Sequence, residues 1–99
     1  MAKKGYWIGH VNVTNPEGYK DYIAANAAAF KKYGGRFLVR NGDCVVPEGS
    51  LAGRRHVVIE FDSYGAAKAC YDSPEYQAAI KLRSAASTGD LVIIEGYEG

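Results

Sequence analysis

His10 is the side chain of this sequence best suited to proton transfer near neutral pH. It lies in the alternating segment 5–13, where strand geometry would place it on one face with Tyr6, Ile8 and Asn12. Because an imidazole titrates in the physiological range, His10 could serve as a general acid or base. The alternative is a hydrogen-bonded histidine that only orients a subunit interface.

Two further ionisable groups, His56 and Glu60, share one face of the segment 54–61, whose opposite face is purely apolar. Arg36 and Arg40 lie on a neighbouring predicted strand, so a charged Glu60 could pair with either of them across the sheet. We favour a structural ion-pair network in a dimer interface over a polar pocket, because charged side chains are rarely buried without partners.

Asn26 falls on the apolar stripe of a predicted helix, where a buried amide must be hydrogen-bonded or face a cavity. Aromatic side chains could form the walls of such a cavity, namely Trp7, Tyr22, Phe30 and Tyr71. Aromatic walls with a few polar groups suit a small organic ligand. The alternative is a filled core, which a stripe at helical spacing usually represents.

Arg83 lies near the end of the last predicted helix, which ends before Gly89. It could attract an anionic ligand. An arginine at this position more often complements the negative end of the helix dipole, and we favour that interpretation.

Turn and cap signals divide the chain into the elements that must position these residues. Asn15 and Pro16 are typical of a helix start, Gly34 of a helix end, and Pro74 of a break within a helix. The predicted elements are a strand at 5–13, a helix at 16–33, strands at 36–40 and 54–61, a helix from Asp62 or Ser63 that Pro74 interrupts, and a strand at 91–97.

The order β-α-β-β-α-β predicts an α+β fold of the split βαβ or ferredoxin-like kind, formed by one domain over residues 1–99. Right-handed crossovers place both helices on one face of a four-stranded antiparallel sheet. The other face is left open and carries Ile8, Leu38 and Val58, an apolar surface that favours burial. We therefore expect a homodimer in which two open sheet faces pack against each other about a twofold axis.

Composition excludes several classes of function. A net charge of +1 with dispersed basic residues predicts neither nucleic-acid nor membrane binding, and the apolar runs are too short to span a bilayer. The N-terminus lacks the apolar region of a signal peptide, so we expect a cytoplasmic protein with Cys44 and Cys70 reduced, Cys70 within the core. Without metal-ligand spacing or a glycine-rich phosphate motif, we expect neither a metal nor a cofactor.

The segments YWIGHVNVTNP at 6–16, YGGRFLVR at 33–40, VVIEF at 57–61 and SPEYQAA at 73–79 together resemble DUF1330, a family of domains of unknown function. That family belongs to the dimeric α+β barrel superfamily of ferredoxin-like folds, so the resemblance implies this fold and a dimer. The wider superfamily includes cofactor-independent monooxygenases, lactone isomerases, haem-degrading enzymes and stress-response proteins. A shared fold does not select among these activities.

These residues support two hypotheses. In the first, the chain binds or transforms a small organic metabolite, aromatic or carboxylated, as a cofactor-independent monooxygenase or isomerase at most. In the second, it is a non-catalytic stress-associated or structural protein whose polar sheet face serves assembly. An enclosed pocket touching His10 or Asn26 would favour the first. In that pocket, His10 would transfer a proton, and Asn26 and Tyr71 would orient the ligand. Arg36 or Arg83 would bind its negative charge, and Trp7 and Tyr22 would form the pocket wall.

Overall fold

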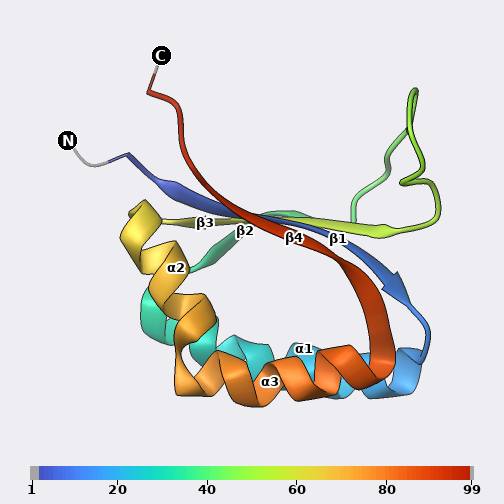
Figure 1. Cartoon of the computed structure of the whole chain (residues 1–99), viewed down its shortest axis with the longest axis horizontal. Coiled ribbons are helices and arrows are strands. Elements are labelled where there is room, and N and C mark those ends of the chain that lie inside the picture. The colour runs from blue at the N-terminus through green and yellow to red at the C-terminus, as the bar shows by residue number, and fades with distance from the viewer. Residues whose placement is uncertain (1–2, 99) are drawn as a thin grey trace.

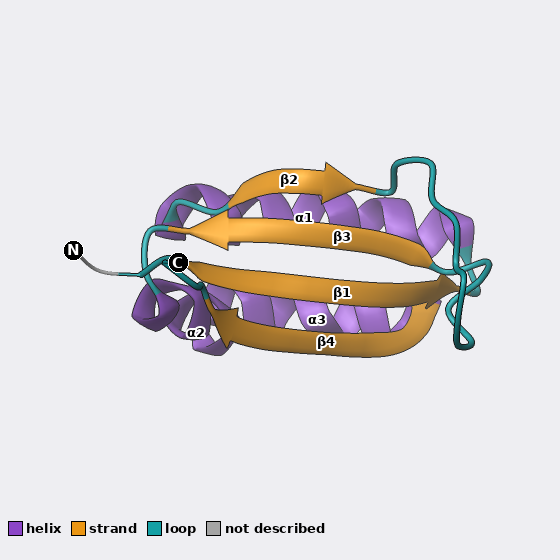
Figure 2. Cartoon of the chain, turned by 90° about the horizontal axis from the view of Figure 1, so that it is seen from above, coloured by secondary structure: helices purple, strands orange, loops and turns teal. Residues whose placement is uncertain are grey.

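The computed structural model describes residues 3–98 and places three helices on one face of a four-stranded antiparallel sheet (Figures 1 and 2). The sheet order is β2-β3-β1-β4. The predicted ferredoxin-like arrangement is therefore confirmed. The elements are β1 (Gly5–Val13), α1 (Pro16–Tyr33), β2 (Arg36–Arg40), β3 (Arg55–Phe61), α2 (Tyr64–Asp72), α3 (Pro74–Ala86) and β4 (Ser87–Glu95).

The helix boundaries follow the cap residues seen in the sequence. The Asn15 side chain accepts a hydrogen bond from the Gly18 amide at the start of α1, and Gly34 ends that helix in the left-handed conformation, with φ of 75°. Ser73 separates α2 from α3, because its hydroxyl donates to the Cys70 carbonyl and accepts from the Tyr76 amide. The predicted break at Pro74 is confirmed.

A register shift in β2 changes the face on which Arg40 lies. The pairing with β3 is irregular between Phe37 and Val39, so Arg40 is opposite Val57. Since Val57 faces the helices, the expectation that Arg36 and Arg40 share one face is wrong. A β-bulge has this effect, because one extra residue reverses the alternation of side chains beyond it.

Strand β4 begins at Ser87, earlier than the expected residue 91, because the chain passes from α3 into the sheet without a loop. Gly89 lies inside this strand, opposite Val11. A Cβ atom at Gly89 would collide with the backbone of His10, so only glycine allows β4 to cross β1 this closely.

The sheet has a covered face and an open face. Trp7, Ile59 and Phe61 are buried against the helices. The open face carries partly or largely exposed apolar side chains, and the segment 41–54 between β2 and β3 rises from the sheet on the side away from the helices (Figure 1). Among residues 3–98, no helix has both the length and the apolar character that crossing a membrane requires.

Candidate ligand cavity

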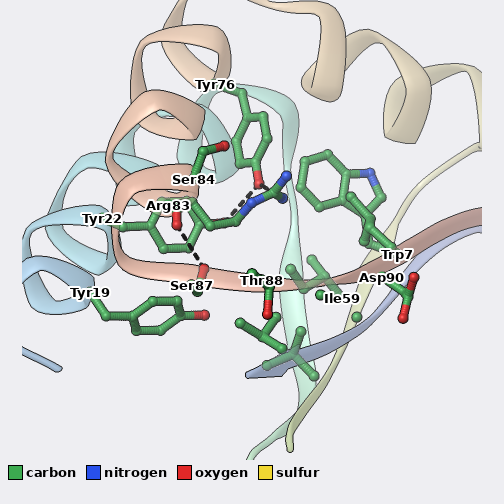
Figure 3. A pocket seen from close by; sticks show the side chains of 15 residues that line it. Trp7, Tyr19, Tyr22, Ile59, Tyr76, Arg83, Ser84, Ser87, Thr88 and Asp90 are labelled. Carbon is green, nitrogen blue, oxygen red and sulfur yellow. Dashed lines mark hydrogen bonds between the residues drawn. The ribbon is translucent and has the colours of Figure 1, made fainter. Parts of the chain in front are cut away.

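A cavity of about 360 Å³ lies between the sheet and helices α1 and α3 (Figure 3). Its volume falls at the lower end of the range typical of small-molecule sites. The sheet contributes the apolar floor, and the helices contribute tyrosines and an arginine. The lining residues are Trp7, Gly9, Val11, Tyr19, Tyr22, Val57, Ile59, Tyr76, Arg83, Ser84, Ser87, Thr88, Gly89, Asp90 and Leu91.

A chain of hydrogen bonds from Arg83 to Tyr22 forms the polar centre of this cavity. An Arg83 Nη1 hydrogen is donated to the Tyr76 hydroxyl over 2.8 Å, and the Tyr76 and Tyr22 hydroxyls lie 2.8 Å apart. Tyr76 and Arg83 are seven residues apart on α3, about two helical turns, so both face the same way. Figure 3 shows their side chains pointing toward each other between Tyr22 and Trp7.

Burial keeps the phenols of Tyr19 and Tyr76 protonated. Tyr76 is 0% exposed, and this burial, together with the neighbouring Tyr22, raises the pKa of its phenol. The pKa of Tyr19 is also raised, mainly by burial. These phenols are therefore neutral hydrogen-bond donors at physiological pH, and Arg83 supplies the positive charge.

The placement of Arg83 bears on both interpretations made from the sequence. Arg83 is the basic residue in the last turn of α3, and its guanidinium also reaches back two turns to donate to Tyr76. Arg83 forms no ion pair with a carboxylate of residues 3–98, whereas Arg36 pairs with Glu60 and Asp62, and Arg54 pairs with Asp90. The alternative of an anionic ligand fits this geometry better.

Of the predicted site residues, Trp7, Tyr22 and Arg83 line the cavity. The Trp7 indole N–H donates to the Ala67 carbonyl over 2.8 Å, so only its ring is available to a ligand. Tyr71 does not line the cavity. Its ring packs 5.5 Å from that of Tyr76 and 5.9 Å from that of Trp7, behind the cavity wall.

Asn26 faces a smaller pocket of about 30 Å³ that shares Tyr19 and Tyr22 with the main cavity. The residue is 5% exposed. A pocket of this size has room for about one ordered water. Asn26 therefore faces a pocket between helix and sheet, one of the two environments that the sequence allowed.

His10 and Arg36 lie on the open face, with the sheet between them and the cavity. The Nδ1 atoms of His10 and His56 are 2.9 Å apart. Arg36 donates to Glu60 over 2.8 Å, which confirms one of the two predicted cross-strand pairs. This hydrogen bond, with a second from Tyr6, lowers the pKa of Glu60. The structure thus separates these two residues from the other candidates.

Tyr76 and Tyr19 belong to the cavity but were absent from the sequence-based candidates. A signal for Tyr76 existed, since its spacing from Arg83 puts both on one helix face. The segment from Ser84 to Asp90 carried no such signal, because the helix was expected to continue until just before Gly89. Its contribution depends on the early start of β4.

The fold is a ferredoxin-like α+β sandwich with a cavity between the sheet and the helices. The family DUF1330, described as a domain of unknown function, matches residues 4–97, and the chain belongs to that family. No curated protein matches this sequence.

Several solved structures share the fold. The RPA0582 protein of unknown function from Rhodopseudomonas palustris has a TM-score of 0.79 at 19% identity, covering 100% of this chain and 86% of that one. SnoaB, a cofactor-independent oxygenase from Streptomyces nogalater, has a TM-score of 0.67 at 16% identity, covering 99% and 97%. At3g17210 from Arabidopsis thaliana has a TM-score of 0.63 at 14% identity, covering 96% and 95%.

Proposed function

We propose that this protein binds a small organic molecule in the cavity between helices α1 and α3 and the sheet. The observation that carries the proposal is the Arg83–Tyr76–Tyr22 hydrogen-bond chain at the centre of a space with apolar and aromatic walls. In a core filled only by packed side chains, a half-buried guanidinium without a carboxylate partner would be unusual, because charged groups are rarely buried unpaired. Polar groups that converge in an apolar cavity are typical of a ligand site.

The fold relatives are compatible with this proposal. SnoaB is a cofactor-independent oxygenase with the same fold, which shows that such a sandwich can support small-molecule chemistry. In the present chain, His10 and the cavity lie on opposite sides of the sheet, and burial raises the pKa of Tyr19 and Tyr76. The geometry therefore supports binding more directly than proton abstraction.

A thermal-shift screen with aromatic acids, phenols and lactones tests the proposal. A ligand that binds only the folded state raises the melting temperature by an amount set by its concentration and dissociation constant. We expect hits whose shift is abolished in Gly9→Val, because a side chain at Gly9 would project into the cavity. Ala85→Val on the exposed side of α3 is the matched control. Absence of any hit, or hits unchanged in Gly9→Val, would contradict the proposal.

We also propose that the open sheet face packs against a second copy of the chain. The largest exposures among apolar side chains on this side of the molecule include Val45 at 88% and Tyr97 at 93%. Strand residues Val39, Val92 and Ile94 add to the same surface. So much apolar surface on one side is typical of an interface.

A further inference from the structure

The Tyr22–Tyr76 pair leaves one phenolic hydrogen unused whichever way it is oriented. The two hydroxyls carry two hydrogens, and their mutual hydrogen bond over 2.8 Å uses one of them. Arg83 can only donate, so its bond to Tyr76 uses an oxygen lone pair and no hydroxyl hydrogen. The second hydrogen has no acceptor among the described residues, and both tyrosines line the cavity. When Tyr76 donates to Tyr22, this hydrogen is on Tyr22, which is 6% exposed and can present it to a ligand oxygen, whereas Tyr76 is 0% exposed.

Arg83 adds further donors at the same place. A guanidinium has five N–H groups, and one bond to Tyr76 accounts for a single hydrogen. Its charge has no carboxylate partner within residues 3–98. A half-buried cation of this kind favours a negative partner, and charge-assisted hydrogen bonds are the stronger ones.

The rest of the cavity sets limits on what carries that negative charge. The floor is formed by the apolar side chains of Val11, Val57 and Ile59, with the Trp7 ring beside Tyr76. Asp90 is the carboxylate of the lining, and it pairs with Arg54 over 2.9 Å. Arg83 is the one cation of this lining, and the Asp90 carboxylate would repel a second negative charge, so a ligand with two negative charges is disfavoured.

From this arrangement we infer that the cavity selects a monoanionic ligand with a flat apolar body, whose negatively charged oxygen is bound by Arg83 and the Tyr76–Tyr22 hydroxyl pair. The inference rests on the proposed binding function and specifies its ligand class. Carboxylates and phenolates share the required chemistry, because each presents a charged oxygen in the plane of an aromatic ring.

Calorimetric titration with 2-naphthoate and its neutral isostere 2-naphthamide tests this inference. We expect the carboxylate to bind at least about tenfold more tightly, and Arg83→Gln to weaken it by about 10- to 100-fold while leaving the amide nearly unchanged. Arg83→Lys, which keeps the charge, should recover part of the loss. Arg36→Gln on the open face is the matched control and should bind both compounds as the parent protein does.

A second titration distinguishes the two sources of the anion. If phenolates are bound, the pKa of 4-nitrophenol should be lower in the cavity than in water, so that its coloured anion forms at lower pH, and Tyr22→Phe should reduce this shift. Binding of naphthoate without this shift would restrict the ligand to carboxylates.

The outcomes separate this inference from the proposed function. Equal affinity for naphthoate and naphthamide, or an Arg83→Gln variant that folds normally and still prefers the carboxylate, would overturn the anion specificity while leaving a ligand cavity. Failure of both compounds to bind would overturn the proposed function together with the inference. Circular dichroism of each variant shows whether the fold is retained.

Discussion

Tyr76 connects the stability of the protein to its candidate site. Its hydroxyl is fully buried and bonds both Tyr22 and Arg83, so removing it leaves two polar groups with fewer partners. We expect Tyr76→Phe to lower the free energy of unfolding by about 1–2 kcal/mol. The loss should not be larger, because water in the cavity can replace the lost hydrogen bonds. Urea denaturation measures this change. Tyr64→Phe, at a partly exposed position outside the cavity, should have no effect; equal losses in the two variants would contradict the assignment.

The two cysteines differ in the environment of their thiols, and the difference is measurable. Burial, with a smaller contribution from Glu75, raises the pKa of Cys70 to about 12, whereas Cys44 is exposed. Because the thiolate is the reactive form, a thiol reagent should modify Cys44 alone in the folded protein and both cysteines in denaturant. Rapid modification of Cys70 in native Cys44→Ser would mean that the core opens easily.

Single residues also show how far the sequence predicts the site. The alternation in β1 and β3 placed His10 and Trp7 on opposite faces correctly, because a strand has a fixed period. Arg40 was misplaced because a β-bulge has no clear signature in the segment RFLVR. The contact of Arg83 with Tyr76, two turns earlier on the same helix, was within reach of the sequence, whereas the contact of Tyr76 with Tyr22 depends on how α1 packs on α3.

At the scale of elements, the junction between α2 and α3 positions Tyr76. The Ser73 hydroxyl closes one helix and caps the next, and its acceptor bond is to the Tyr76 amide. We expect Ser73→Ala to lower the free energy of unfolding by about 1–2 kcal/mol, the usual effect of losing a buried cap. It should also weaken ligand binding, because Tyr76 and Arg83 lie on the same helix. Chemical denaturation and a binding titration check the two effects.

Ser63→Ala, at the N-cap of α2, is the control for Ser73→Ala. Ser63 accepts a hydrogen bond from the Ala66 amide at the start of α2 and does not line the cavity. It should reduce stability to a similar extent and leave the affinity for naphthoate unchanged. Loss of affinity in both variants would show that the cavity responds to general destabilisation of the helices.

At the scale of the whole molecule, the two sheet faces carry different groups of side chains. The covered face and the helices enclose the cavity, whereas the open face carries the His10–His56 contact and the Arg36–Glu60–Tyr6 network among apolar side chains. The residues of the first hypothesis drawn from the sequence are therefore divided between the two faces, with His10 and Arg36 on the open face and Trp7, Tyr22 and Arg83 at the cavity. A ligand site and an assembly surface can coexist in this fold without sharing a residue.

The apolar side chains of the open face predict a homodimer. We expect sedimentation equilibrium at micromolar concentration to give twice the chain mass, since a free apolar face of this kind is costly in water. Val58→Asp would place an unpaired carboxylate in the middle of that face and should produce a folded monomer. Because Val58 points away from the cavity, the monomer should still bind naphthoate. A parent protein with the mass of one chain would contradict the dimer, and loss of binding in a folded monomer would show that the cavity depends on it.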